Sequence, residues 1–148
     1  MVKKLALVVP SIKMQEVKII ELPKISDVRG NLTFLENFSQ IPFEINRVFW
    51  TYDVPGGESR GGHAYYQQYE CIIALSGSFD VVVTDVHGEE RKYSLNRSYF
   101  GLLMPPKTWR HMENFSTNSL GLHLSSMQFS EKDYIRDFDV YKKIKKGI

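Results

Sequence analysis

Residues 57–65 read GESRGGHAY, and Glu70 and Gly77 follow, so the whole stretch has the pattern G-x5-H-x-Y-x4-E-x6-G. Successive side chains of a strand point to opposite faces, so His63 and Tyr65 would share one face if this stretch is extended. An imidazole, a phenol and a carboxylate are groups that can move protons or bind polar ligands. We therefore expect this stretch to carry the chemistry of the chain.

The bulk composition is that of one globular domain. The chain has 148 residues, of which 43% are hydrophobic, and its 13% aromatic content favours strands. A net charge of +2 gives no electrostatic case for nucleic-acid binding. No apolar stretch approaches the roughly 20 residues that span a bilayer. The single cysteine, Cys71, excludes an intrachain disulfide and fits a reducing compartment, so we expect a soluble cytoplasmic protein without nucleic-acid or membrane partners.

Short strand-like runs recur along the chain and are separated by turn residues. Gly77 and Gly88 mark tight turns, and the pair Pro105-Pro106 cannot continue a central strand. Many short strands at regular spacing indicate a β-sandwich or barrel, and jelly rolls are one such architecture. We expect an N-terminal extension over residues 1–14 and one all-β domain over residues 15–148. The expected strands are residues 15–21, 30–34, 45–53, 69–76, 77–85, 89–95, 99–104, 109–114 and 119–125.

Only the C-terminal segment has a helical pattern. Ser130 offers an N-cap before an acidic first turn, and Tyr134, Ile135, Phe138 and Tyr141 then recur at helical spacing. We therefore expect a short C-terminal helix that begins after Ser130. Its aromatic stripe is expected to pack against the barrel.

The pattern of residues 57–77 resembles the first motif of the cupin barrel, in which a second histidine stands at the position of Tyr65. The resemblance implies a jelly-roll barrel of the RmlC-like type. In metal-binding cupins both histidines, the glutamate and a histidine from a second motif are ligands, and here His63, Glu70 and His111 remain. A neutral phenol is a poor ligand for divalent metals, so we expect no metal. A metal-dependent cupin is the rival interpretation.

Further segments resemble the nucleotide-sugar 3,4-ketoisomerases, a WxcM-like family of cupins that act on dTDP-4-keto-6-deoxyglucose. The resemblance extends from about residue 17 to residue 143. It implies a dTDP-linked keto-deoxysugar as substrate, no cofactor, a role in surface polysaccharide biosynthesis, and a homodimer that can exchange N-terminal strands. The matching segments are residues 27–32 (DVRGNL), 41–48 (IPFEINRV), 60–64 (RGGHA), 75–78 (LSGS), 101–102 (GL), 106–109 (PKTW) and 133–137 (DYIRD).

The family's reaction suggests catalytic roles for two residues. A ketone at C4 of the sugar acidifies the proton on C3, a base removes that proton, and a proton returns at C4. By the resemblance His63 is the catalytic base, which suits an imidazole that titrates near neutral pH. Tyr65 replaces the family's second histidine, and its phenol, which ionises near pH 10, can donate a proton or polarise an oxygen. The alternative for His63 is a structural, hydrogen-bonded barrel histidine.

The resemblance also implies two arginine contacts to the substrate. Arg60 matches a position at the sugar site. Arg29 resembles an arginine that related dTDP-sugar cupins place near the diphosphate, and a guanidinium can bind phosphate bidentately. The alternative for Arg29 is an ion pair with Asp27 or a contact across a subunit interface.

Four more candidates are Trp50, Trp109, Arg110 and His111. The two tryptophans are candidate apolar walls of the site, with core packing the alternative for Trp109. Arg110 stands where ketoisomerases commonly have histidine, and His111 is shifted by one position. Because a one-residue shift moves a side chain to the opposite face of a strand, these two residues compete for the inward position.

Two other functions remain open. Related dTDP-sugar cupins are 3,5-epimerases that use a histidine base with a tyrosine acid, and Tyr65 fits that pairing. The loss of the second histidine also fits a non-catalytic nucleotide-sugar-binding cupin. We assign no role to His87 or His123.

Overall fold

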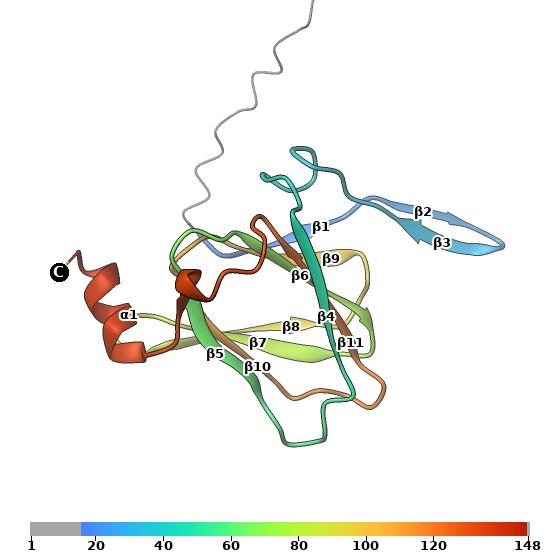
Figure 1. The fold of residues 1–148 in the computed structure, drawn as a ribbon. Helices are drawn as coiled ribbons and strands as arrows, with labels where there is room; N and C mark the ends of the chain where they lie inside the picture. The colour runs from blue at the N-terminus through green and yellow to red at the C-terminus, as the bar shows by residue number, and fades with distance from the viewer. Residues whose placement is uncertain (1–15, 148) are drawn as a thin grey trace, which may run out of the picture.

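The structure is a computed structural model that describes residues 16–147. It consists of two five-stranded antiparallel sheets that face each other, a two-stranded hairpin and a short C-terminal helix (Figure 1). The expected extension over residues 1–14 lies outside the described residues. The first sheet contains, in spatial order, β1 (Lys18–Glu21), β9 (Phe100–Met104), β6 (Glu70–Ser76), β11 (Leu120–Ser125) and β4 (Arg47–Tyr52).

The second sheet faces the inner side of the first, and the chain crosses between the two sheets at tight turns. Gly77 makes the turn from one sheet to the other, with a φ of 64°, and a Cβ there would lie 2.8 Å from the Cα of Ser119. This turn therefore requires glycine. The second sheet contains, in spatial order, β12 (Tyr134–Ile135), β5 (Arg60–Tyr65), β10 (Trp109–Glu113), β7 (Phe79–Thr84) and β8 (Glu90–Leu95).

Apolar side chains from both sheets fill the space between them. Ile72 and Leu102 of the first sheet pack in one buried cluster with Phe79, Val81 and Met112 of the second. A second cluster, which includes Ile41, Phe43 and Leu103, covers part of the outer face of the first sheet. The barrel is therefore closed by packing at one end, and polar residues concentrate elsewhere between the sheets.

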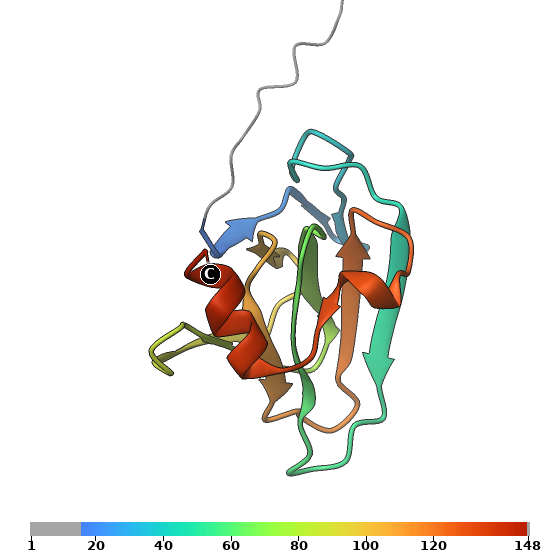
Figure 2. The same ribbon diagram turned by 60° about the vertical axis from the view of Figure 1, so that its left-hand side comes forward.

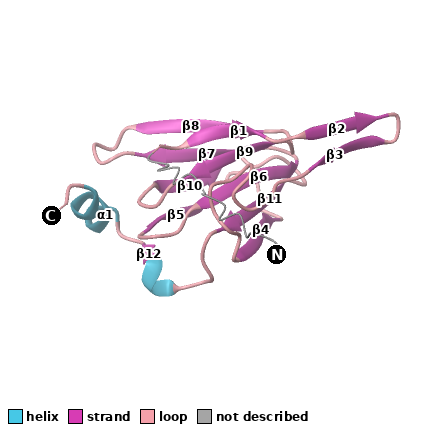
Figure 3. Ribbon diagram, turned by 90° about the horizontal axis from the view of Figure 1, so that it is seen from above, coloured by secondary structure: helices cyan, strands magenta, loops and turns pink. Residues whose placement is uncertain are grey.

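The nine expected strands correspond to β1, β3, β4 and β6 to β11, with ends that differ by a few residues. Three strands were not among the nine: β5, β12 and β2 (Lys24–Asp27), of which β2 pairs with β3 (Gly30–Thr33). The β2–β3 hairpin projects away from the barrel (Figures 1 and 3), and nearly all its side chains are exposed. Its short strands and high exposure explain why no alternating pattern marked β2.

The expected helix start after Ser130 was wrong. A 3-10 turn at Glu131–Asp133 leads into β12, and the helix α1 (Phe138–Lys145) begins seven residues beyond Glu131. Asp137 is its N-cap and accepts a hydrogen bond from the amide of Val140. The pairing of β12 with β5 competes with helix formation in this segment and prevails.

The helix itself packs on one flank of the barrel, as Figure 2 shows. The rings of Phe138 and Tyr141 contact Trp109, with centroid distances of 5.2 and 5.7 Å. The expected packing of the aromatic stripe against the barrel thus holds for Phe138 and Tyr141, whereas Tyr134 lies in β12 instead of the helix. No helix within residues 16–147 is long and apolar enough to cross a membrane.

Candidate functional site

A polar cavity of about 500 Å³ opens between the two sheets. Its walls come from β4, β6 and β11 of the first sheet and from β5, β10 and β12 of the second. It is the point where charged and titratable side chains of both sheets converge. The lining residues used below are Thr51, Arg60, His63, Tyr65, Glu70, Arg110, His111, His123, Tyr134 and Arg136.

A β-bulge in β5 sets the geometry of one wall. Arg110 lies opposite His63 and His111 lies opposite Gly61, so Gly62 is the extra residue. Both glycines have positive φ angles, 101° for Gly61 and 81° for Gly62. Glycine in this conformation is typical of a bulge, which bends the strand and re-aims the side chains that follow.

The bulge places both Arg110 and His111 at the cavity. Arg110 is buried, with 3% of its surface exposed, and therefore takes the inward position. His111 is partly buried and its Nε2 lies 3.2 Å from Glu113. Sequence alternation alone could not show that both residues line the same cavity.

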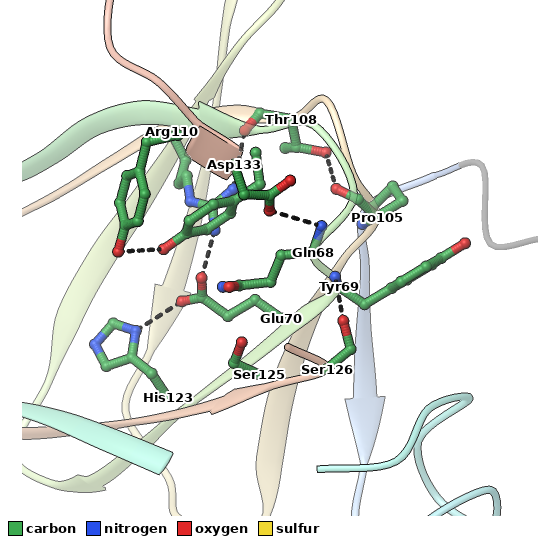
Figure 4. Close-up of polar contacts among 12 residues, drawn as sticks. Gln68, Tyr69, Glu70, Pro105, Thr108, Arg110, His123, Ser125, Ser126 and Asp133 are labelled. Atoms are coloured by element: carbon green, nitrogen blue, oxygen red, sulfur yellow. Dashed lines mark hydrogen bonds and ion pairs between the residues drawn. The ribbon is translucent and has the colours of Figure 1, made fainter. Parts of the chain in front are cut away.

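The buried carboxylate of Glu70 contacts both Arg110 and His123 at the floor of the cavity (Figure 4). One of its oxygens accepts a hydrogen bond from the guanidinium of Arg110, and the other lies 2.7 Å from Nδ1 of His123. Arg110 also donates to the carbonyl oxygen of Thr108 at 3.0 Å. Burial alone would raise the pKa of Glu70, but Arg110 and His123 outweigh it and lower this pKa to about 2. Glu70 is therefore a fixed negative charge at neutral pH.

His63 and Tyr65 share one face of β5, as expected, and Tyr134 of β12 joins them. The ring centroids are 4.9 Å apart for His63 and Tyr65 and 5.1 Å apart for His63 and Tyr134. Asp133 fixes this segment, since its carboxylate accepts hydrogen bonds from the amides of Gln67 and Gln68. Three aromatic side chains thus form one wall of the cavity.

The environment of His63 keeps its imidazole neutral. Burial and the nearby charge of Arg110 lower its pKa to about 3. Its Nε2 is buried and forms no hydrogen bond with residues 16–147. A neutral imidazole with a free ring nitrogen in a polar cavity is suited to proton transfer with a bound ligand.

Tyr65 is buried and acts as a hydrogen-bond donor. Burial and the charge of Glu70 raise the pKa of its phenol, so the phenol stays protonated at neutral pH. Its hydroxyl donates to the hydroxyl of Tyr134 at 3.3 Å, and the Arg110 guanidinium lies 4.4 Å from the centre of its ring. Tyr65 can therefore polarise an oxygen but is a poor base.

The remaining candidates occupy different places. Arg60 lies at the exposed mouth of the cavity. Trp50 is 59% exposed, and its neighbours Phe49 and Thr51 line the cavity, so Trp50 points to the opposite face of β4. Trp109 packs against α1 and does not line the cavity within this chain.

Arg29 lies in the projecting hairpin rather than at the cavity. Its guanidinium forms an ion pair with Asp27 at 2.8 Å, and both side chains are exposed. This is the ion pair that the sequence left open as an alternative to diphosphate binding. A role for Arg29 in binding would require another copy of the chain.

Among the cavity residues that sequence reasoning missed are the polar side chains of Thr51, His123, Tyr134 and Arg136. Thr51 and Trp50 are neighbours on β4 and therefore point to opposite faces of the sheet. The alternation along this strand could have indicated Thr51 as an inward-facing residue. Tyr134 was assigned to a helix, so its pairing with β5 was not considered. Within residues 16–147, no three His, Cys, Asp or Glu side chains converge as a group that could hold a metal ion.

Comparison with known proteins confirms the resemblance. Residues 15–146 match the family described as FdtA (WxcM-like, C-terminal). The chain belongs to this family. It is 36% identical over 128 residues to a TDP-4-oxo-6-deoxy-alpha-D-glucose-3,4-oxoisomerase of Aneurinibacillus thermoaerophilus, covering 86% of this chain and 91% of that protein.

Two solved structures support the same assignment. A 3,4-ketoisomerase from Helicobacter canadensis is 35% identical, with a TM-score of 0.83 and coverage of 87% of this chain and 96% of that one. A histidine-to-asparagine variant of the 3,4-ketoisomerase QdtA from Thermoanaerobacterium thermosaccharolyticum, in complex with TDP-4-keto-6-deoxyglucose, is 32% identical, with a TM-score of 0.86 and coverage of 90% and 96%. The cupin jelly roll and the isomerase class are thereby confirmed for this chain.

Proposed function

We propose that this chain is a 3,4-ketoisomerase that converts dTDP-4-keto-6-deoxy-D-glucose to a dTDP-3-keto-6-deoxyhexose. The observation that carries the proposal is the neutral imidazole of His63, which lines the polar cavity between the sheets and whose buried Nε2 has no hydrogen-bond partner within residues 16–147. The family membership and the named activities of the relatives support the same reaction. We also propose that the 3-keto sugar nucleotide is used in surface polysaccharide biosynthesis.

The proposed reaction moves one carbon-bound hydrogen and one oxygen-bound proton. His63 removes the C3 proton, the C3–H electron pair forms the C3–C4 double bond of an enediolate, and the C4 carbonyl π electrons move to O4. His63 then returns the proton at C4 while O3 loses its proton and becomes the C3 ketone oxygen. One base suffices if it reaches both carbons from the same face of the sugar. Tyr65 donates its hydrogen bond to Tyr134 and leaves the Tyr134 hydroxyl free to donate to the charged oxygen, and such donors stabilise developing negative charge.

The mouth of the cavity supplies groups for the diphosphate. Arg60 is exposed there, and Arg136 lines the same opening while its guanidinium lies 4.2 Å from the centre of the Tyr134 ring. Guanidinium groups bind phosphate oxygens in a fixed bidentate geometry. We therefore assign the diphosphate to this edge of the cavity and the sugar to the side chains of His63 and Tyr65.

A homodimer is part of the proposal. The β2–β3 hairpin carries exposed apolar side chains, with Ile25 58% and Leu32 56% exposed, and projects away from its own barrel (Figure 3). Pairing with a second copy would cover this hairpin and could bring Arg29 to a neighbouring site, with or without exchange of N-terminal strands. Light scattering on the wild type and on the variant Leu32→Glu tests this: a dimer that Leu32→Glu weakens supports it, and a wild-type monomer overturns it.

We also place the protein in the cytoplasm. The single cysteine, Cys71, is a buried free thiol, and a protein without disulfides suits a reducing compartment. Fractionation of the producing cells tests this location. Recovery with the membrane or secreted fraction would contradict it.

The activity is tested by incubating the protein with dTDP-4-keto-6-deoxyglucose in D2O and following the sugar by proton NMR. We expect a 3-keto sugar in which C4 carries the proton that His63 returns, replaced by deuterium only to the extent that the His63 proton exchanges with solvent, and the coupling of the remaining C4 proton gives the stereochemistry of the product. The variant His63→Asn should form no product, whereas His87→Asn, which alters an exposed turn histidine, should match the wild type. Deuterium at C5 would indicate a 3,5-epimerase, and ligand binding without any conversion would indicate a non-catalytic binder.

A further inference from the structure

Besides His63 and His111, a third histidine lines the cavity: His123, which lies on β11 in the sheet opposite His63. Its ring is stacked on Phe49, with 4.3 Å between ring centroids and an angle of 10° between the planes. Its Nδ1 lies 2.7 Å from Glu70, and its Nε2 lies 3.0 Å from the hydroxyl oxygen of Thr51. Both ring nitrogens are therefore engaged in one chain of contacts from Thr51 to Glu70.

The charge on Glu70 determines the direction of these hydrogen bonds. An ionised carboxylate can only accept, so Nδ1 of His123 carries a hydrogen and donates it to Glu70. In the neutral imidazole the other nitrogen, Nε2, is then an acceptor, and the Thr51 hydroxyl donates to it. In this row of hydrogen bonds, Thr51 can accept a proton from a ligand while it passes its own proton to Nε2 of His123.

This arrangement is difficult to explain by stability alone. Glu70, Arg110 and His123 are buried together, with 2%, 3% and 4% of their surfaces exposed. Replacing buried ionic groups by well-packed apolar residues is often neutral or stabilising. These three residues are buried, whereas Thr51, which is hydrogen-bonded to His123, is partly exposed. Thr51 also lines the same cavity as His63.

We propose that Thr51, His123 and Glu70 form a second proton pathway that moves the proton from O3 to O4 of the sugar. The inference rests on the proposed 3,4-ketoisomerase reaction and explains a step that His63 does not perform. Thr51 takes the O3 proton while its own proton passes to Nε2 of His123. The reverse transfer delivers a proton to O4, so the three residues return to their starting state and no external acid or base is needed.

The roles within this pathway differ. Thr51 is the catalytic residue that touches the sugar oxygens, and His123 holds the proton in transit. Glu70 is a positioning residue, because its negative charge fixes the tautomer of His123 and stabilises the imidazolium that forms. Tyr65 keeps its proton and donates its hydrogen bond to Tyr134, so it cannot take up the O3 proton and cannot replace this pathway.

The first test separates the two proton movements in D2O. NMR measures two quantities for the wild type, Thr51→Val and Thr51→Ser: the deuterium that exchanges into C3 of the recovered substrate, and the amount of 3-keto product. The ratio of the first to the second is compared between the three proteins. We expect Thr51→Val to slow product formation about a hundredfold, as loss of acid–base assistance typically does, while C3 exchange by His63 continues and the ratio rises. Thr51→Ser, which keeps the hydroxyl, should restore most of the activity.

Controls exclude a merely structural effect. Thr84→Val makes the same change on β7, away from the cavity, and should behave as the wild type. His123→Gln should raise the exchange-to-product ratio in the same way as Thr51→Val. If Thr51→Val leaves product formation unchanged, or lowers exchange and product formation equally, the pathway is overturned.

The second test does not depend on turnover. Nitrogen-15 NMR of the imidazole reports which nitrogen of His123 carries the hydrogen, and we expect the Nδ1–H tautomer with a shift of the Nε2 signal in Thr51→Val. Finding the hydrogen on Nε2 would overturn the pathway even if the isomerase activity is established. A wild type that forms no 3-keto sugar would instead refute the proposed function, and with it the assigned sugar oxygens.

Discussion

The hydroxyl of Tyr65 donates a hydrogen bond to the hydroxyl of Tyr134 across 3.3 Å, and the two rings meet edge to face with centroids 4.7 Å apart. Because Tyr65 uses its proton on Tyr134, the hydroxyl of Tyr134 keeps its own proton for a group in the cavity. Tyr65 and Tyr134 therefore act as one donor pair beside His63. Of this pair, Tyr65 stands where the family pattern has its second histidine, whereas Tyr134 lies in a segment that matches the family.

Removing the hydroxyl of Tyr65 should lower kcat with little effect on folding. We expect Tyr134→Phe to reduce kcat of the isomerisation about a hundredfold, as does loss of one donor to a charged oxygen, and Tyr65→Phe, which removes the hydrogen bond that orients Tyr134, to reduce it less. Steady-state kinetics on dTDP-4-keto-6-deoxyglucose measure this. Tyr66→Phe removes a hydroxyl from the adjacent, exposed residue and should have no effect. Equal kcat values for Tyr65→Phe and the wild type would show that the pair only fills space.

The depressed pKa of His63 should make the fold sensitive to mild acid. The pKa of His63 is about 3 in the folded chain and 6.5 ordinarily, so between these values the unfolded chain binds a proton that the folded chain does not. The free energy of unfolding should therefore fall as pH decreases below about 6.5, by up to about 1.4 kcal/mol per pH unit. Glu70 loses its stabilising charge only at lower pH, as pH falls from 4.5 through about 2.

Denaturant titrations at pH 7.5 and pH 5 distinguish these two groups. His63→Asn should lose less stability than the wild type between these pH values, because its side chain does not titrate. His87→Asn removes an exposed imidazole and should follow the wild type. An identical loss in all three proteins would mean that His63 is already protonated in the folded chain.

The buried pair of Glu70 and Arg110 should show strong energetic coupling. Glu70→Gln leaves the Arg110 guanidinium buried without its counter-ion, which typically costs about 3–5 kcal/mol. Arg110→Met leaves the buried carboxylate with His123 as a partner but without its guanidinium counter-ion and should cost a similar amount, whereas the double variant should recover much of the loss. A double-mutant cycle from chemical denaturation measures the coupling. Additive losses would show that the two charges do not depend on each other.

Much of the fold was predictable because its signals are local. Alternation and turn residues located nine strands, and the spacing of His63, Glu70 and Gly77 indicated the barrel. The segment at Tyr134 was misread because its apolar spacing also fits a helix. Whether this segment forms a strand or a helix depends on its pairing with β5, and the local sequence pattern carries no information about that pairing.

The candidate site was predictable only along β5. His63 and Tyr65 follow from alternation on one strand, and both line the cavity. His123 and Thr51 lie far apart in sequence and meet through the pairing of β4 with β11, so no spacing rule connects them. Trp50 was chosen because the resembling ketoisomerases often have tyrosine in this strand, but its position in the alternation of β4 points it away from the cavity.

The β5 bulge depends on two glycines for different reasons, and matched substitutions should separate these reasons. A Cβ at Gly61 would lie 3.1 Å from the Cα of His111 and 3.2 Å from the carbonyl oxygen of Arg110, whereas a Cβ at Gly62 meets nothing within 4 Å. Both positions have positive φ, so each alanine variant should lose about 1–3 kcal/mol from backbone strain. Gly61→Ala should also push β10 away and disturb Arg110 and His111. We expect a larger loss of stability and of kcat for Gly61→Ala than for Gly62→Ala, measured by thermal unfolding and steady-state kinetics. Equal effects would show that strain alone fixes the bulge and that close contact with β10 is not required to position Arg110 against His63.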